Sequence, residues 1–274
     1  MSTRKDKFSK KDKKYMSLAL SLANARHGLT GENPSVGCVI VKNDEIISIG
    51  QTGYNGTPHA EFNAIKNSNE NLEGAKMYVT LEPCSHYGKT PPCTNIIIKS
   101  KLKEVVYAVV DIDKKVKDKT LKILQSKNIL VKKNLLKKEV NKFYTPYFFN
   151  RNNKLPYVTG KIAISKNNLI YSKNTKRISD IHTDKFTHFL RYKNDSLMIS
   201  SKTLKKDNPK LNCRLEGLNK FSPKRIILDR NLETKRNSYI FKTANKSNTI
   251  IFYHNAKIKE KLMFKKKGIT LIKG

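Results

Sequence analysis

The stretch TLEPCSHYGKTPPC (residues 80–93) places two cysteines around a short, proline-stiffened loop, in a chain with four cysteines in all. Ahead of it, TPHAEFNAI (57–65) predicts a helix that begins just after a proline. One histidine and two cysteines can ligate Zn²⁺ and leave a fourth position open for water, as catalytic zinc sites do. We therefore expect a zinc site of His59, Cys84 and Cys93, with Glu61 as the catalytic acid–base residue beside it.

The charges of these groups suit that chemistry. Two thiolates and a neutral imidazole balance Zn²⁺, and both cysteines lie near the expected start of a helix, whose positive end favours thiolate. Glu61 can carry a proton from a zinc-bound water to a substrate nitrogen. Taken singly, each of these residues would be interpreted as a core-packing residue or a surface residue. Together they match the H-x-E…P-C…C signature of zinc deaminases that act on nucleobases.

Helices and strands alternate around these motifs, which predicts α/β layers around one sheet. The segment VGCVIVKNDEIISIG (36–50) reads as a hairpin with an Asn-Asp turn, and its Cys38 is expected in the core. The nearly continuous apolar run EVVYAVVDID (104–113) predicts a central strand. Cys213 has no Cys or His nearby in the sequence and is expected to be incidental. The other expected elements are helices at 12–26, 58–67, 93–101 and 120–127 and strands at 75–83 and 129–133.

A chain of 274 residues suits two domains. Two prolines bracket a polar segment in YTPYFFNRNNKLPY (144–157), which predicts a boundary. We expect a basic tail (1–11), a zinc-dependent deaminase domain (12–150) and a second α/β domain (151–274). In the second domain, strands are expected at 157–165, 195–201, 225–229 and 249–254, a helix at 182–193, and a further strand beginning in 268–274.

The formal net charge is +34, from 56 Lys and Arg against 22 Asp and Glu. A nucleic-acid partner is one interpretation. We favour codon drift, because Lys, Asn and Ile share A/T-rich codons and the basic residues are spread along the chain rather than clustered. The charge should still attract phosphorylated substrates. No apolar run is long enough to span a membrane and no secretory signal is present, so a cytoplasmic location is expected.

The eight residues between Cys84 and Cys93 are more than the signature's two. With NPSVGCVIV (33–41) and TPHAEFNAI, this long loop resembles the deaminase domain of the bifunctional riboflavin-biosynthesis deaminase/reductases. The resemblance implies a cytidine-deaminase-like three-layer fold and hydrolytic deamination of a phosphoribosylamino-pyrimidinone. It also implies that His59, Cys84 and Cys93 hold zinc, that Glu61 shuttles the proton, and that Asn33, His86 and Lys89 contact the substrate.

The second domain resembles the NADPH-dependent, dihydrofolate-reductase-like domain of the same family, through PYVTGKIAIS (156–165), HFLR (188–191) and TLKKDNPKLNCR (203–214). That domain reduces a ribosyl group to ribityl. By position, the resemblance implies cofactor contacts at Ala163, Thr203 and Asp207 and substrate contacts at Thr175, Arg191, Leu211 and Arg214. The family also suggests a homo-oligomer.

Several positions depart from the family pattern. Thr52 replaces a common His, so we expect changed substrate affinity. Lys166-Asn167-Asn168 replaces Leu-Asp-Gly, and Arg177 replaces a cofactor-side Trp. The family's C-terminal glycine-rich segment, which would bring backbone N–H groups to the cofactor phosphates, does not follow residue 274. We therefore expect an incomplete reductase domain and a weakened NADPH site.

Two alternatives remain open at this point. The chain could be a deaminase of tRNA or free nucleosides. The net charge favours this interpretation, and the long loop between the cysteines argues against it. It could also be a non-catalytic zinc module that binds nucleic acid. Replacing Glu61 by Gln separates the two classes, since only an enzyme should lose turnover while keeping zinc.

Overall fold

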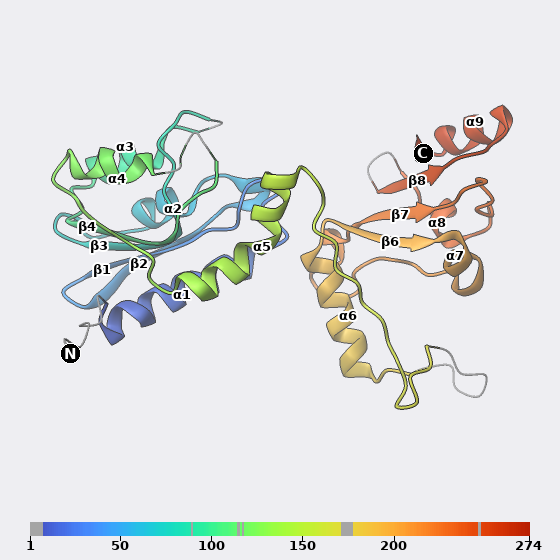
Figure 1. Ribbon diagram of the computed structural model, residues 1–274, viewed down its shortest axis with the longest axis horizontal. Coiled ribbons are helices and arrows are strands. Elements are labelled where there is room, and N and C mark those ends of the chain that lie inside the picture. Colours follow the sequence, from blue (N-terminus) through green and yellow to red (C-terminus); the bar gives the residue numbers. More distant parts are fainter. Residues whose placement is uncertain (1–7, 89, 114–115, 117, 171–177, 246–247) are drawn as a thin grey trace. The chain divides into compact units, whose positions relative to one another are not determined.

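The computed structural model describes residues 8–88, 90–113, 116, 118–170, 178–245 and 248–274 (Figure 1). The chain divides into two compact units, residues 1–160 and 161–274. The sequence-based boundary between residues 150 and 151 falls inside helix α5 (Lys137–Asn153). Pro146 lies within that helix. The ring of Tyr144 packs against those of Phe143, Tyr147 and Phe148, and this packing offsets the roughly 3 kcal/mol that an interior proline costs.

The first unit is built on a five-stranded sheet in the order β2-β1-β3-β4-β5. The predicted hairpin is confirmed, since β1 and β2 pair antiparallel. Its turn residues Asn43 and Asp44 both have positive φ, as a two-residue hairpin turn requires. Strand β4 is buried along its whole length and lies between β3 and β5, as its apolar run predicts. The strands are β1 (Gly37–Lys42), β2 (Glu45–Gln51), β3 (Lys76–Leu81), β4 (Glu104–Val109) and β5 (Leu130–Lys133).

Helices cover both faces of this sheet, giving three layers (Figure 1). Helices α1 (Lys10–Arg26) and α5 lie on one face, and α2 (Ala60–Lys66), α3 (Cys93–Lys99) and α4 (Lys119–Gln125) lie on the other. A short 3₁₀ turn, η1 (Tyr54–Gly56), precedes α2. The predicted basic tail is shorter than expected, because Ser9 and Asp12 form a capping box that starts α1 at Lys10.

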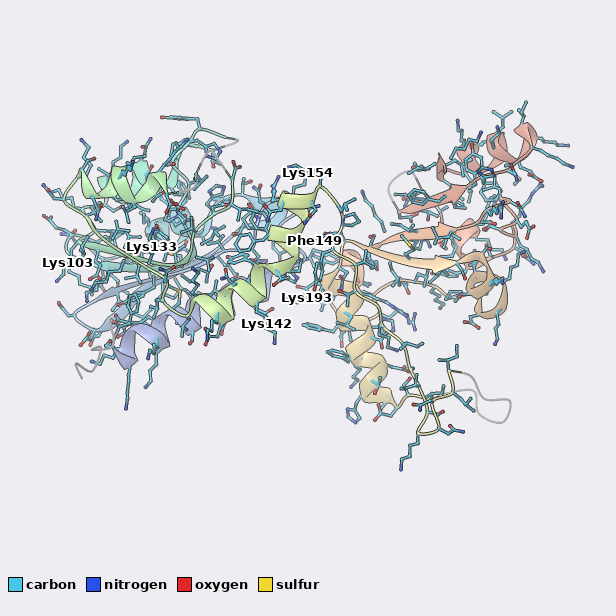
Figure 2. The ribbon with its side chains drawn as sticks, viewed as in Figure 1. Lys103, Lys133, Lys142, Phe149, Lys154 and Lys193 are labelled. Atoms are coloured by element: carbon cyan, nitrogen blue, oxygen red, sulfur yellow. The ribbon has the colours of Figure 1, made fainter. Side chains whose placement is uncertain are left out.

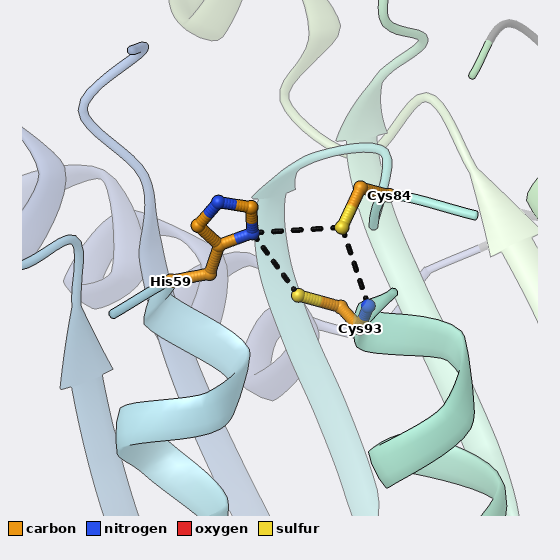
Figure 3. A group of neighbouring side chains, drawn as sticks. All are labelled: His59, Cys84 and Cys93. Carbon is orange, nitrogen blue, oxygen red and sulfur yellow. Dashed lines mark hydrogen bonds between the residues drawn. The ribbon is translucent and has the colours of Figure 1, made fainter. Parts of the chain in front are cut away.

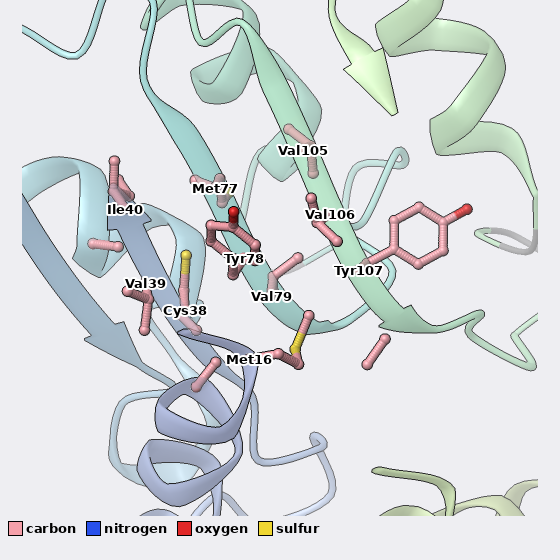
Figure 4. Packing of buried hydrophobic residues seen from close by; sticks show 14 of the residues in the cluster. Met16, Cys38, Val39, Ile40, Met77, Tyr78, Val79, Val105, Val106 and Tyr107 are labelled. Atoms are coloured by element: carbon pink, nitrogen blue, oxygen red, sulfur yellow. The ribbon is translucent and has the colours of Figure 1, made fainter. Parts of the chain in front are cut away.

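The core of the first unit lies between the sheet and its helices (Figure 4). Met16 of α1 packs there with Cys38, which is fully buried as predicted. Two glycines set the spacing of the layers. A Cβ at Gly37 would lie 1.9 Å from Ala19 O in α1, and one at Gly50 would lie 2.2 Å from Ala60 O in α2. Each helix backbone therefore rests directly on a strand.

The second unit contains a four-stranded parallel sheet in the order β6-β7-β8-β9. Ile227 and Ile251 from its central strands pack with Leu204 and Phe264 in a separate core. The strands are β6 (Ser196–Ser200), β7 (Lys224–Leu228), β8 (Thr249–Tyr253) and β9 (Thr270–Lys273). The helices are α6 (Ile181–Lys193), α7 (Ser201–Asp207), α8 (Tyr239–Lys242) and α9 (Ile258–Lys266), with a 3₁₀ turn η2 (Asn219–Phe221).

One strand predicted for the second domain is wrong. Residues 157–165 form neither strand nor helix, and Val158 is 80% exposed and Ile162 69% exposed. An alternating apolar pattern makes a strand only where a neighbour completes its hydrogen-bond ladder. Among the described residues, no strand pairs with this segment.

The positive charge is distributed over many elements (Figure 2). The labelled lysines include Lys133 at the end of β5, Lys142 in α5 and Lys193 at the end of α6. Some of them are neutralised locally, as Lys133 Nζ is by Asp118 Oδ1 at 3.0 Å. In the part of the chain that the structure describes, no helix combines the length and apolar character needed to cross a bilayer.

Candidate metal centre

The predicted site residues meet where β3 ends and two helices begin (Figure 3). His59 is the residue that precedes α2, with extended backbone, and Glu61 lies in the first turn of that helix. Cys84 follows β3 by three residues, and Cys93 is the first residue of α3. The long loop between the cysteines thus brings the end of a strand back to the start of a helix.

The three candidate ligands have a geometry that suits zinc. His59 Nδ1 lies 3.3 Å from Cys93 Sγ and 3.5 Å from Cys84 Sγ. All three ligand atoms lie within 4.8 Å of one another. Tetrahedral zinc, with Zn–S near 2.3 Å and Zn–N near 2.1 Å, separates nitrogen from sulfur by about 3.6 Å. The two nitrogen–sulfur distances therefore suit zinc, and the residues offer three protein ligands, as a catalytic site does.

The electrostatics of the pair of cysteines favour a cation. A hydrogen bond from the Cys93 thiol, and next one from His59, lower the pKa of Cys84 to about 4, although burial acts in the opposite direction. The backbone N–H of Cys93 also donates to Cys84 Sγ at 3.2 Å. The same pairing, with burial, raises the pKa of Cys93. Without metal, Cys84 is thus the thiolate and Cys93 keeps the proton, which metal binding would release.

Glu61 is the most perturbed carboxyl group at the site. It is 4% exposed. Burial, and next the negative charge of Cys84, raise the pKa of Glu61 from 4.5 to about 7. A carboxyl group with this pKa can both accept and donate a proton near neutral pH, which is what general acid–base catalysis requires. The environment of Glu61 thus supports the role expected from the sequence.

Two polar atoms beside Cys84 have no partner. Ser85 Oγ and His86 Nδ1 are buried and make no hydrogen bond with any described residue. Buried polar groups are normally paired, so these atoms are candidates for contact with a bound molecule. His86 was expected there from the sequence, but Ser85 was not, since nothing in the local pattern shows that its hydroxyl is buried unpaired. Lys89 lies outside the described residues.

Asn33 and Thr52 belong to the backbone framework that leads to His59. Asn33 Nδ2 donates to Gly56 O at 3.0 Å, in the turn just before α2. Thr52 is 2% exposed, and its Oγ1 accepts the Val36 N–H at 2.9 Å. The Thr52 hydroxyl is therefore engaged with the start of β1. At the position where the family commonly has a histidine, this hydroxyl thus holds the backbone, and the expected change in substrate affinity stays a prediction.

In the second unit, two of the predicted substrate residues gather around one loop. Arg191 NH1 donates to Asn212 O at 3.0 Å, and Arg214 NH1 donates to Asn212 Oδ1 at 3.1 Å. His188 Nδ1 accepts the Arg214 N–H at 3.1 Å. Burial, and then Arg191 and Arg214, lower the pKa of His188. Two guanidinium groups that converge on one loop suit an anionic ligand.

The remaining predicted residues of the second unit are more scattered. Leu211 is 4% exposed, and its side chain packs in the core. Ala163 lies in the irregular segment before α6, while Thr203 and Asp207 belong to α7. Thr175 and Arg177 lie outside the described residues. The described residues thus bring Arg191 and Arg214 together, and they place two of the expected cofactor contacts on α7 and the third, Ala163, in the irregular segment before α6.

Two protein-family models match this chain. Residues 9–109 match the cytidine and deoxycytidylate deaminase zinc-binding region, and residues 156–269 match the RibD C-terminal domain. Each match lies mainly within one of the two units. The first contains the candidate zinc ligands, and the second contains the cluster around Asn212.

Curated relatives agree with both matches. The chain is 35% identical over 265 residues to the riboflavin biosynthesis protein RibD of Aquifex aeolicus, covering 96% of this chain and 74% of that protein. It is 38% identical over 220 residues to RibD of Bacillus amyloliquefaciens, covering 80% of this chain and 59% of that protein. A diaminohydroxyphosphoribosylamino-pyrimidine deaminase of Buchnera aphidicola (subsp. Schizaphis graminum) is 41% identical over 146 residues, 53% of this chain and 99% of that protein.

Solved structures show the same architecture. Acinetobacter baumannii RibD superposes with a TM-score of 0.84 at 29% identity, covering 97% of this chain and 74% of that chain. A deaminase/reductase from Thermotoga maritima superposes with a TM-score of 0.81 at 30% identity, covering 96% of this chain and 81% of that chain. Both units of this chain therefore have counterparts in experimentally determined structures.

Proposed function

Because this chain belongs to the RibD family of riboflavin-biosynthesis proteins, we propose that its first unit hydrolyses the amino group of 2,5-diamino-6-(5-phosphoribosylamino)pyrimidin-4(3H)-one. The observation that carries this proposal is the metal geometry, with His59 Nδ1 within 3.5 Å of both sulfurs and a buried Glu61 on the same helix. Neither a closed structural zinc site nor a nucleic-acid module needs a proton-transfer group held there.

The residues of the site have distinct tasks in this reaction. His59, Cys84 and Cys93 would hold Zn²⁺, which lowers the pKa of a bound water to about 7. Glu61 would accept protons from the attacking water and pass them to a ring nitrogen and to the leaving amino group, so that ammonia leaves and a carbonyl replaces it. In the metal-free protein, burial and Cys84 raise the pKa of Glu61 to about 7, and bound Zn²⁺ would lower it again toward the ionised form that accepts a proton.

The substrate is bound, we infer, by residues beside the metal. Ser85 Oγ and His86 Nδ1 are buried without a partner among the described residues. They can hydrogen-bond the pyrimidinone without losing an existing contact. Asn33 and Lys89 remain proposed substrate contacts on the strength of the family resemblance. A lysine side chain is suited to ribose or phosphate oxygens.

Ammonia release tests this function. Protein loaded with zinc should release ammonia from the pyrimidine, and Glu61→Gln should lower the rate by about 10²–10⁴-fold while keeping its zinc. Glu73→Gln is the control, because Glu73 is an exposed carboxylate of the same unit that pairs with Lys101. Ammonia released only from cytidine or tRNA would refute the substrate. Full turnover by Glu61→Gln would refute the role of Glu61.

The second unit is the reductase domain of this family, which acts with NADPH. We propose that Arg191 and Arg214 receive the substrate phosphate, since both guanidinium groups converge on Asn212. Ala163, Thr203 and Asp207 stay proposed cofactor contacts, and Thr175 and Leu211 proposed substrate contacts. NADPH oxidation with the deaminated product measures the activity. The replaced cofactor-side positions, Lys166-Asn167-Asn168 and Arg177, predict slow turnover, and an ordinary rate of about 1–10³ s⁻¹ would contradict it.

Other expectations from the sequence stay predictions. These are a cytoplasmic location, a homo-oligomer and the lack of a nucleic-acid partner. The spread of basic residues along the sequence supports the last of them, because nucleic-acid sites gather basic residues into one footprint.

A further inference from the structure

A buried carboxylate two residues before Cys84 holds a distant part of the chain. Glu82 is 3% exposed. Its Oε2 accepts the backbone N–H of Asp111 at 3.3 Å and that of Asp118 at 3.2 Å. Its Oε1 accepts the N–H of Thr120 at 3.3 Å. The Glu82 side chain at the end of β3 thus accepts hydrogen bonds from three backbone N–H groups that follow β4.

These contacts replace the usual cap of α4. The first N–H groups of a helix have no partner within it and need an outside acceptor. Asp118 stands at the N-cap position of α4 but has left-handed backbone, with φ 57°, and its side chain makes no capping bond. Glu82 supplies the missing acceptor from another element, so the position of α4 is tied to the end of β3.

A second contact joins the same two segments. Thr120 is fully buried, and its Oγ1 donates to Pro83 O at 2.5 Å. Residues 82 and 83 are therefore both held by the start of α4, and the next residue is the candidate zinc ligand Cys84. On its other side, Cys84 O accepts the Thr94 N–H at 3.2 Å. Cys84 is thus held between α4 and α3.

We propose that Glu82 and Thr120 form a strut that positions Cys84 for zinc binding, an inference that rests on the proposed zinc site. We call this pair the Glu82–Thr120 strut. Neither residue contributes a ligand atom to the His59, Cys84 and Cys93 group, so both are positioning residues. Partners that orient metal ligands typically change metal affinity or activity by about 10–100-fold when they are replaced.

Zinc release to a chromogenic chelator tests the strut in the full-length protein. Glu82→Gln keeps the shape of the side chain but removes the charge, and Thr120→Val removes only the hydroxyl. Both should release zinc about 10–100-fold faster than the wild-type protein. Thr120→Ser keeps the hydroxyl and should release zinc at nearly the wild-type rate. Absorption of the cobalt-substituted protein gives a second readout, because the thiolate–cobalt bands should shift only in the first two variants.

Glu104→Gln is the matched control. Glu104 is also 3% exposed, and it accepts Lys132 Nζ at 2.7 Å. Glu104 begins β4 and pairs with Lys76 of β3. At the other end of β4, Val109 pairs with Leu81, the residue that precedes Glu82. Five residues of strand separate the two ends by about 16 Å. Glu104→Gln should therefore lower stability without changing zinc release.

The outcomes of this zinc-release test can be told apart from those of the test of the proposed function. Wild-type zinc release in both Glu82→Gln and Thr120→Val would overturn the strut, as would equally fast release in Glu104→Gln. If Glu82→Gln does not fold, the comparison of Thr120→Val with Thr120→Ser decides the question alone. The proposed substrate is decided by ammonia release from the wild-type protein, which does not enter this comparison.

Discussion

At the scale of single residues, the surroundings of Glu61 determine its chemistry. A carboxyl group in water is ionised at neutral pH, but burial and the nearby Cys84 raise the pKa of Glu61 to about 7. The sequence places Glu61 two residues from His59 and so predicts its role. Its pKa depends on how deeply α2 is buried, which no local pattern reveals.

This pKa predicts how the stability of the zinc-free protein changes with pH. Because folding raises the pKa of Glu61 from 4.5 to about 7, its contribution to stability is present below pH 4.5 and is lost as the pH rises through 7. In zinc-free protein, Glu61→Gln should therefore increase the free energy of unfolding at pH 8 by about 1–3 kcal/mol. At pH 4.5 the change should be smaller. Urea unfolding at the two pH values measures both differences.

The exposed Glu73→Gln variant is the control for that measurement and should show no such pH dependence. An equal effect of Glu61→Gln at both pH values would show that the carboxyl group is not held in the neutral form.

At the scale of elements, the metal centre depends on how closely α2 lies against β2. Helix α2 has only seven residues, and His59 directly precedes it. So short a helix has little intrinsic stability and depends on packing. Gly50 of β2 provides that packing, since its lack of a side chain lets the backbone of α2 rest on the strand.

Substituting this glycine should disturb both packing and metal binding. A Cβ at position 50 would lie 2.2 Å from Ala60 O and 2.4 Å from Ala64 N, so α2 would have to move. Gly50→Ala should destabilise the protein by about 1–3 kcal/mol or more and speed zinc release. Thermal unfolding and chelator competition measure the two effects. Gly160→Ala is the control, because a Cβ there meets no atom within 4 Å. Unchanged zinc release in Gly50→Ala would show that α2 tolerates displacement.

At the scale of the whole molecule, two units carry separate sheets and separate cores. The candidate zinc ligands, Glu61 and the Glu82–Thr120 strut all belong to residues 1–160. A Buchnera deaminase matches this chain along 99% of its own length and over only 146 residues here. Nearly the whole of this relative therefore corresponds to the deaminase unit.

This arrangement predicts that residues 1–160 suffice for deamination. The fragment should fold, bind zinc and release ammonia from the pyrimidine within about threefold of the full chain, because its hydrophobic core is its own. Circular dichroism checks the fold, and the ammonia assay checks the activity. The same fragment carrying Glu61→Gln is the inactive control. A folded, zinc-loaded fragment without activity would show that the second unit contributes to the deaminase site.

Sequence alone predicted the candidate metal ligands and the acid–base residue, and it determined the hairpin and the central strand. These follow from residue types at short spacings, and a ligand set or an apolar period is a local property. The α/β layering also followed, because helices and strands alternate along the chain, and the family resemblance implied the three-layer form.

Only the tertiary structure decided the rest. The predicted strand at 157–165 is absent, since a strand needs a partner that its own pattern cannot supply. The pKa of Glu61, the engaged hydroxyl of Thr52 and the contacts of Glu82 with residues after β4 all arise between segments far apart in sequence. Desolvation and long-range hydrogen bonding depend on which segments meet, and that is settled only when the chain has folded.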